Sequence, residues 1–401
     1  MIKFKYMKLD KSILTLFVIT FIYTGSFSQV PGVYDVNNYL PFLKNRNVGL
    51  VVNQTSLVDG VHLLDTLISL GVNIVSIFSP EHGFSGTFNA GEYFNDSIYN
   101  ESVPIISLYG KNKNLKDRDL YNVDVMVFDI QDVGVRFYTY ISTLHYVMEG
   151  CAKNNIKLIV LDRLNPHSHY VDGPVLQKKY SSFVGMHPVP IVYGMTIGEY
   201  ALMINGEGWL KDNLVCDLNV IKNLLYSRYA PIDYSFSVPP SPNLRTMNAI
   251  SLYPSLCLFE GTLISVGRGS EMPFEIFGAP FLNQDTFPFL FLPKPNFGSN
   301  NPKYNSQLCY GWSLKSNSDD QPSNIGVEVD SLNLNYLIYA YRNTPDQYRS
   351  KFFNSFFNKL AGNSELQQQI VNGVDVLRIR KSWERGLKEF KVIRTKYLLY
   401  D

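Results

Sequence analysis

The stretch VNIVSIFSPEHGFSG, residues 72–86, decides the fold. Its first half, residues 72–78, is apolar, rich in β-branched side chains and free of strict polar alternation, which predicts a strand buried on both faces. The strand ends at Pro80, and Glu81 and His82 follow at once. Ligands bind at the carboxyl ends of strands in open α/β sheets, so a carboxylate beside an imidazole predicts a functional site there. The alternative is an ordinary polar loop.

Strand and helix patterns alternate around this stretch. Apolar runs and helical spacing predict strands at residues 48–56, 103–110, 123–130 and 157–163, and helices at residues 61–71 and 139–155. Such alternation is typical of an α/β fold with helices over a parallel sheet. The carboxyl ends of parallel strands share one edge, so we expect residues 129–132 and the pair Asp162 and Arg163 to converge with Glu81 and His82 on one crevice.

Length and composition limit the function. A chain of 401 residues is too long for one small core and predicts two domains. The net charge is +1, from 36 basic and 35 acidic residues, and no basic run occurs, which argues against nucleic acid as the main partner. The 27 tyrosines and 26 phenylalanines would suit stacking on sugars, although many must simply fill the core.

The N-terminus has the pattern of a secretory signal. Four lysines precede the apolar run ILTLFVITFIY at residues 13–23, and small residues stand at Ser26 and Ser28. This predicts a signal peptide at residues 1–28 and an exported protein, periplasmic or secreted. The apolar run is short for a membrane span, and no later run is long enough for one. The alternative interpretation of residues 13–23 is a buried N-terminal helix.

The chain changes character after Pro166. Residues 167–193 form a long stretch without clear periodicity, which is typical of a functional loop or lid. Thr196, with Glu199 three residues on, predicts a capping box at the start of a helix that ends near residue 205. We expect a domain boundary there, which gives one unit at residues 29–205 and a smaller one at residues 206–401.

The second unit is predicted to mix short strands and helices. Residues 281–301, rich in Pro, Phe and Asn, predict a loop, and residues from 331 onward predict a mainly helical C-terminus that closes with residues 370–400. The four cysteines are spaced too widely for a disulfide framework or a zinc site, so we expect mostly buried thiols with room for one disulfide.

Absent motifs narrow the chemistry. The chain has no G-x-G-x-x-G after its first strand, no Walker sequence, no G-x-S-x-G elbow and no H-E-x-x-H, so we expect no cofactor and no metal. Carboxylates remain, at Glu81, Glu92, Asp129, Asp132, Asp162 and Asp172. Clustered carboxylates in an exported protein favour hydrolysis of a glycoside, in which one carboxylic acid protonates the leaving oxygen.

Several long motifs occur in order along the chain. They are SPEHGFSGTFNAGE (79–92), VFDIQDVGVRFYTYIST (127–143), LDRLNP (161–166), VDGPVL (171–176), FVGMHPVPIVYGMTIGE (183–199), PSPNL (240–244), LFEGTLISVGRG (258–269), PFEIFGAP (273–280) and the closing TKYLLY. In these motifs the chain resembles the exo-β-N-acetylmuramidase NamZ family, formerly a domain of unknown function, over nearly its whole length after residue 28.

The resemblance implies an exo-acting glycosidase that releases N-acetylmuramic acid from non-reducing ends of peptidoglycan glycans such as MurNAc-GlcNAc. It also implies a Rossmann-like N-terminal subdomain, with a parallel sheet flanked by helices, and a smaller α+β C-terminal subdomain. The site would lie in the cleft between them. The protein would therefore act in cell-wall turnover. A site in this cleft agrees with the crevice predicted from the strand ends.

Residue roles follow from the matching motifs. The resemblance implies that Glu81 or Glu92 is the catalytic carboxylate. It also implies a catalytic tyrosine, which is Tyr138 or, alternatively, Tyr140, and an acid on a lid, which is Asp172. Family members often have Glu at that last place, so its role here is in doubt. Substrate binding is expected from a set of polar residues, namely His82, Arg136, Tyr140, Asp162, Arg163, Asn165, His187 and Arg268.

Among these, an arginine suits the lactyl carboxylate of muramic acid, and Arg136, Arg163 and Arg268 are the candidates. Each could instead pair with a neighbouring aspartate. Arg245 is a second departure, at a place where the family pattern would have proline.

Two other functions compete with the glycosidase. The first is the binding of muropeptides in the cleft without cleavage, and the departure at Asp172 leaves this function open. A nucleotide-dependent enzyme is disfavoured by the missing phosphate loop and by the export signal.

Overall fold

The computed structural model describes residues 29–92, 95–100, 102–110, 113–229, 236–315 and 330–401. The expected signal peptide at residues 1–28 lies outside this range. Among the described residues, no helix is long and apolar enough to cross a membrane.

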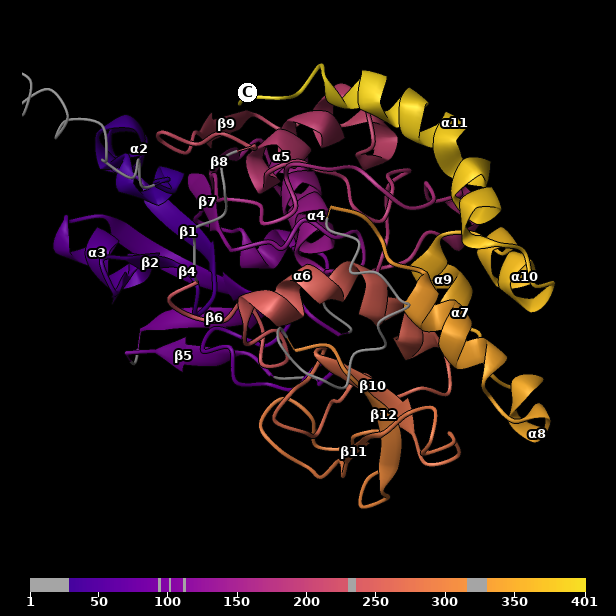
Figure 1. The fold of residues 1–401 in the computed structure, drawn as a ribbon. Coiled ribbons are helices and arrows are strands. Elements are labelled where there is room, and N and C mark those ends of the chain that lie inside the picture. The colour runs from indigo at the N-terminus through magenta and orange to yellow at the C-terminus, as the bar shows by residue number, and fades with distance from the viewer. Residues whose placement is uncertain (1–28, 93–94, 101, 111–112, 230–235, 316–329) are drawn as a thin grey trace, which may run out of the picture.

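The described part of the N-terminal half is built on one mixed sheet of seven strands, mostly parallel (Figure 1). Their order across the sheet is β5 (Ser97–Tyr99), β6 (Val103–Ser107), β4 (Asn73–Ser79), β1 (Asn47–Val52), β7 (Val125–Asp129), β8 (Lys157–Leu161) and β9 (Leu218–Ile221). Only β5 at the edge runs antiparallel to its neighbour, so the carboxyl ends of the other six lie along one edge. The stretch quoted above supplies β4, next to the centre.

Helices cover both faces of this sheet. One apolar core lies between the sheet and α3 (Leu63–Ser69), together with residues of α2 (Val36–Leu43). The other, larger core joins the opposite face to α4 (Tyr140–Lys153) and α5 (Ile197–Gly206). Side chains along β7 alternate between the two cores, which explains why its sequence is apolar without interruption.

Short elements complete the N-terminal half. They are the hairpin β2 (Leu57–Val58) and β3 (Val61–His62), and the 3₁₀ turns η1 (Gly32–Tyr34), η2 (Asp117–Asp119), η3 (Lys178–Tyr180) and η4 (Lys211–Asn213).

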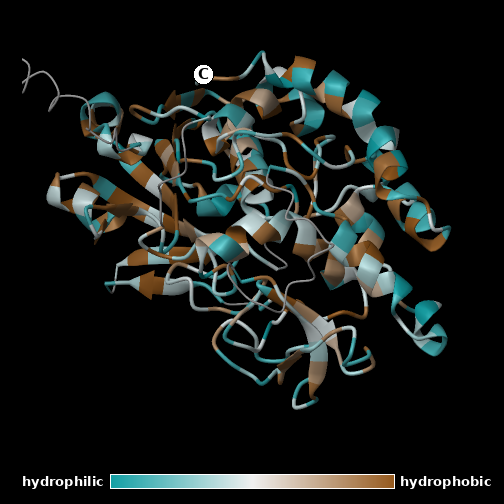
Figure 2. Cartoon of the chain, viewed as in Figure 1, coloured by the Kyte–Doolittle hydropathy of each residue, from teal (hydrophilic) through white to brown (hydrophobic). Residues whose placement is uncertain are grey.

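The C-terminal half is smaller and of α+β type. It contains α6 (Met247–Leu256), η5 (Cys257–Gly261) and an antiparallel sheet in the order β10 (Ile276–Ala279), β12 (Cys309–Ser313), β11 (Phe289–Phe291). Its helices follow as α7 (Asn335–Arg342), α8 (Asp346–Arg349), α9 (Phe357–Ala361), α10 (Glu365–Val371) and α11 (Val376–Arg394). Figure 2 shows teal and brown residues alternating along α11, which buries Ile379, Trp383 and Phe390 on one side.

The predicted α/β class and parallel sheet are confirmed, and several details differ. Strand β9 pairs with β8 in the main sheet, so the N-terminal unit continues past the expected boundary at residues 205 and 206. The expected loop at residues 281–301 contains β11, and the last helix ends at Arg394 instead of reaching residue 400. All four cysteines are buried and free.

The long stretch 167–193 is largely core instead of an exposed lid. Val189, Ile191, Val192 and Tyr193 are fully buried. Their burial needs no secondary structure of their own, because neighbouring segments bond their main chain: Val192 exchanges hydrogen bonds with Asp172.

A buried arginine fastens this stretch to both halves of the molecule. The Arg136 guanidinium is fully buried and donates to the carbonyl oxygens of Pro174 and Val189, at 2.8 Å each, and of Leu360 in α9, at 2.7 Å. Burial lowers the Arg136 pKa to about 9, which still leaves the group charged at neutral pH. Three carbonyl dipoles therefore hold one cation, and they come from segments far apart in the sequence.

We expect Arg136→Met to lower the free energy of unfolding by about 3 kcal/mol, because three buried carbonyls lose their donor. Urea denaturation followed by circular dichroism measures this. Arg385→Met is the matched control: Arg385 lies on exposed surface and pairs within its own helix with Glu389, so its loss should leave the free energy of unfolding close to that of the wild type. An Arg136→Met protein as stable as the control would contradict the assigned role.

Candidate functional site

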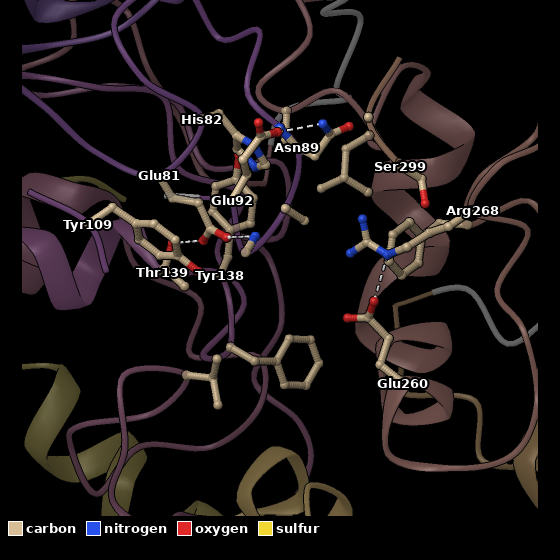
Figure 3. A pocket seen from close by; sticks show the side chains of 18 of the residues that line it. Glu81, His82, Asn89, Glu92, Tyr109, Tyr138, Thr139, Glu260, Arg268 and Ser299 are labelled. Atoms are coloured by element: carbon tan, nitrogen blue, oxygen red, sulfur yellow. Dashed lines mark hydrogen bonds and ion pairs between the residues drawn. The ribbon is translucent and has the colours of Figure 1, made fainter. Parts of the chain in front are cut away.

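A cavity of about 710 Å³ lies between the carboxyl edge of the sheet and the C-terminal half. One wall consists of residues that follow β4, residues 137–139 before α4, and Phe183 and Val184. The other wall comes from residues 241–274 and 298–301, and Phe356 also lines the space. Figure 3 shows the two walls facing each other. The cavity thus lies at the strand ends, where we expect the crevice. The C-terminal half forms its opposite wall.

Glu81 is fixed at the end of β4 by two hydrogen bonds. Its Oε1 accepts from the Gly91 amide at 3.0 Å, and its Oε2 accepts from the Thr139 hydroxyl at 2.8 Å. The residue is 9% exposed. Glu81 therefore joins three segments, the strand end, the following loop and the start of α4, and its carboxyl group stands at the cavity wall (Figure 3).

His82 has an unusual backbone and a fixed ring. Its φ is 73°, in the left-handed region that few side chains other than glycine adopt without support. The support is a 2.7 Å contact of Nδ1 with the Phe88 carbonyl oxygen, which requires the proton on Nδ1. Burial lowers the His82 pKa, while the neighbouring Glu81 raises it to a smaller extent. The ring is therefore neutral at pH 7, with Nε2 as a hydrogen-bond acceptor.

Glu92 is held by one neighbouring residue. Its Oε2 accepts from the backbone amide of Asn89 at 2.9 Å and from the Asn89 side-chain amide at 2.5 Å. These bonds favour the charged form and lower the Glu92 pKa. Glu92 is thus an ionised carboxylate at neutral pH, on the same wall as Glu81.

Tyr138 and Tyr140 take different places. Tyr138 lines the cavity and donates to the Pro240 carbonyl oxygen at 2.8 Å. Tyr140 is 1% exposed and packs edge-on behind it, with ring centroids 4.7 Å apart, and its hydroxyl accepts from Asn53 at 3.1 Å. Burial raises the pKa of both phenols, so both are neutral. The structure thus brings Tyr138 to the cavity wall and sets Tyr140 behind it.

Arg268 stands on the opposite wall. Its Nε donates to Glu260 Oε1 at 2.7 Å, and its guanidinium lies over the Phe274 ring, 5.0 Å from the centroid. Burial alone would lower the Arg268 pKa, but the charge and hydrogen bond of Glu260 raise it above the ordinary value. Figure 3 shows the rest of the guanidinium projecting into the cavity, toward the wall that carries the carboxylates.

Three expected site residues near the end of β8 face other parts of the protein. Asp162 is fully buried and accepts from Thr196 at the start of α5 and from the Tyr400 hydroxyl, at 2.7 and 2.6 Å. Arg163 pairs with Asp129 through two bonds, at 2.5 and 2.8 Å. Asn165 is buried and donates to the Met195 carbonyl oxygen. All three lie outside the cavity, where they join β7, β8, α5 and the C-terminus.

The remaining expected site residues are also buried elsewhere. Arg136 uses its guanidinium on main-chain carbonyls, as described above. His187 contacts the Tyr200 hydroxyl and His145, and its ring stacks on Trp209. Asp172, expected to act from a lid, is 3% exposed and accepts from Arg380 of α11 at 2.8 Å and from the Leu332 amide at 2.7 Å. None of the three lines the cavity.

Three residues of the cavity were not anticipated by the sequence analysis as site residues. Thr139 and Asn89 position Glu81 and Glu92, and Glu260 positions Arg268. Each stands inside a motif quoted above, FYTY, FNAGE or LFEGT, but hydroxyls, amides and lone glutamates are common in loops. Among the described residues, no group of three or more His, Cys, Asp and Glu is placed to hold a metal ion.

The fold and the cavity define a two-part α/β protein that carries paired carboxylates on one wall of a deep cleft. The family model described as exo-beta-N-acetylmuramidase NamZ, N-terminal, matches residues 48–248, and its C-terminal counterpart matches residues 251–400. The chain belongs to this family. The two family models meet near the start of α6, well beyond the expected boundary.

Relatives support the same assignment. The chain is 37% identical over 380 residues to the peptidoglycan beta-N-acetylmuramidase NamZ of Bacillus subtilis (strain 168), which covers 90% of this chain and 89% of that protein. A crystal structure of a DUF1343 family protein from Bacteroides fragilis NCTC 9343 superposes with a TM-score of 0.82 at 41% identity, over 93% of this chain and 99% of the other. A second such protein gives 0.76 at 25% identity, over 94% and 100%.

The electrostatic effect of Glu81 on His82 leads to a prediction that needs no substrate. While it is ionised, Glu81 raises the His82 pKa against the effect of burial, so Glu81→Gln should lower this pKa further. NMR titration of the imidazole measures the change. Glu92→Gln is the control, because Glu92 does not contribute to the His82 pKa. Equal His82 titration in the wild type and Glu81→Gln would show that the two groups do not interact.

Proposed function

We propose that this protein is an exo-acting glycosidase that removes N-acetylmuramic acid from the non-reducing ends of peptidoglycan glycan fragments. The observation that carries the proposal is the pair Glu81 and Glu92 on one wall of a 710 Å³ cavity, in a chain of the exo-β-N-acetylmuramidase NamZ family. Glycoside hydrolysis needs one carboxyl group that donates a proton and commonly a second group that acts as nucleophile or base.

The surroundings of the two carboxylates suggest their roles. Glu92 has a lowered pKa, which keeps it ionised and so suits a nucleophile or charge stabiliser and does not suit an acid. Glu81 is the more buried of the two and contacts a hydroxyl that can rotate between donating and accepting. We therefore assign proton donation to Glu81. The 2-acetamido group of the sugar is a further candidate nucleophile, and in that case Glu92 would stabilise charge.

We further propose that the protein is exported to the periplasm or secreted, with residues 1–28 as the signal peptide. The basic, apolar and small-residue order of that segment supports this. Peptidoglycan fragments outside the cytoplasmic membrane would then be the substrates, with MurNAc-GlcNAc as the smallest natural one.

Leaving-group chemistry distinguishes the two glutamates. A proton donor matters for a sugar leaving group and much less for nitrophenolate, which departs without a proton. We expect Glu81→Gln to lower kcat/KM on MurNAc-GlcNAc by roughly 10³-fold, within the 10²–10⁴-fold range of acid–base catalysis, and far less on 4-nitrophenyl N-acetylmuraminide. Glu92→Gln should impair both substrates alike.

Release of N-acetylmuramic acid, followed by chromatography, and of nitrophenol, followed by absorbance, provides the two readouts. If both variants retained wild-type activity on MurNAc-GlcNAc, neither glutamate would be catalytic. Saturable binding of the disaccharide by the wild type, with no product after long incubation, would instead identify a muropeptide-binding protein.

A further inference from the structure

The two walls of the cavity differ in charge. Glu81 and Glu92 lie on the wall made by the sheet edge, and the opposite wall carries Arg268 with Glu260. Among the described residues that line the cavity, Arg268 is the only arginine or lysine. Lys303 lies nearby, but its ammonium group donates to the carbonyl oxygens of Thr262 and Ile264. An anionic group that enters the cavity therefore has one cation to meet.

Arg268 is held in position while part of its guanidinium stays free. Its described hydrogen bond uses Nε, and Glu260 accepts it at 2.7 Å. The Phe274 ring supports one face of the group. The side chain is 23% exposed, and Figure 3 shows the two terminal nitrogens pointing into the cavity, away from Glu260. These nitrogens present parallel N–H groups, the geometry that binds a carboxylate through two hydrogen bonds.

The turn that carries Arg268 is rigid. Gly267 and Gly269 on either side have φ values of 76° and 83°. A Cβ atom at Gly267 would lie 2.4 Å from the Ile276 side chain, and one at Gly269 would lie 2.5 Å from Pro302. The two glycines thus allow a tight turn that is packed on both sides. This packing fixes the backbone position from which the Arg268 side chain extends.

The other two candidate arginines cannot fill this role. Arg136 spends its guanidinium on three buried carbonyls, and Arg163 is paired bidentately with Asp129 outside the cavity. We propose that Arg268 is the specificity-determining residue of the site and binds the 3-O-lactyl carboxylate of the sugar through its two terminal nitrogens. The inference rests on the proposed function, and it also fixes how the sugar lies.

The charge distribution orients the sugar in the cavity. The lactyl carboxylate is repelled by the ionised Glu92 and attracted to Arg268, so the lactyl group faces the C-terminal half. The glycosidic bond then faces the sheet edge, where the catalytic carboxylates stand. A sugar without the lactyl group, such as N-acetylglucosamine, would leave the guanidinium without its partner and would lose this orientation.

A substrate pair isolates the contact. The two compounds are 4-nitrophenyl N-acetylmuraminide and its lactyl methyl ester, which lacks the charge and adds only one methyl group. We expect Arg268→Gln to lower kcat/KM on the acid by roughly 10- to 100-fold, the range of a charge-assisted hydrogen bond, and to change the ester little. The ratio of acid to ester activity should therefore fall toward one. Arg268→Lys should restore part of it, because a point charge replaces the fork.

Controls separate this proposal from the one on which it rests. Arg385→Gln removes an exposed arginine of α11 that does not line the cavity. This variant should keep the wild-type ratio of acid to ester activity. If Arg268→Gln also keeps it, while the wild type is active, Arg268 does not bind the carboxylate and only this inference fails.

A wild type inactive on both compounds would overturn the proposed function instead. Calorimetry then tests Arg268 without catalysis: the wild type should bind N-acetylmuramic acid more tightly than N-acetylglucosamine, and Arg268→Gln should bind the two alike. Equal preference in wild type and variant would overturn the inference in this case as well.

Discussion

The buried Arg136 guanidinium is the contact on which the arrangement of the site depends. It holds the long stretch 167–193 through two carbonyls and the C-terminal helix α9 through a third. Gly362, directly after α9, has a φ of 79° and lies so close that a Cβ atom there would be 2.7 Å from Arg136 Nη2. A cation without a carboxylate partner is costly to bury, so these dipoles must all be in place. One residue thereby joins both halves through buried hydrogen bonds.

The same residue positions the catalytic wall. Arg136 is followed directly by Phe137, Tyr138 and Thr139, all of which line the cavity. Thr139 in turn bonds Glu81, which belongs to a different strand. The carboxylate is thus supported by the end of β4, by the segment that Arg136 anchors and by the Gly91 amide. Support from several separately packed segments is what keeps a reactive group within the narrow geometry that catalysis requires.

Much of this could be predicted from the sequence, and the limits are physical. The strand ending at Ser79 and the carboxylate after it are local features, so Glu81 and His82 were expected in the crevice. The resemblance added Glu92, Tyr138 and Arg268, which all line the cavity. Asp162 and Arg136 also belong to quoted motifs, yet they face inward toward distant parts of the chain, with one partner of each 238 and 224 residues away. A motif shows that a polar residue matters and does not show which way it points.

The extent of the main sheet is difficult to predict from the sequence for the same reason. The helix α5 ends with a clear signal near residue 205, but β9 returns to the main sheet beyond it and adds an edge strand. Strand addition depends on a pairing that no local pattern reveals, so a helix end alone does not mark where the main sheet is complete. The consequence for the site is direct. Ser241 and Leu244, which lie beyond β9 in the chain, line the cavity, and Tyr138 donates to Pro240. The returning chain therefore supplies the start of the arginine wall, and the hydrogen bond from Tyr138 to Pro240 joins it to the carboxylate wall before any sugar enters.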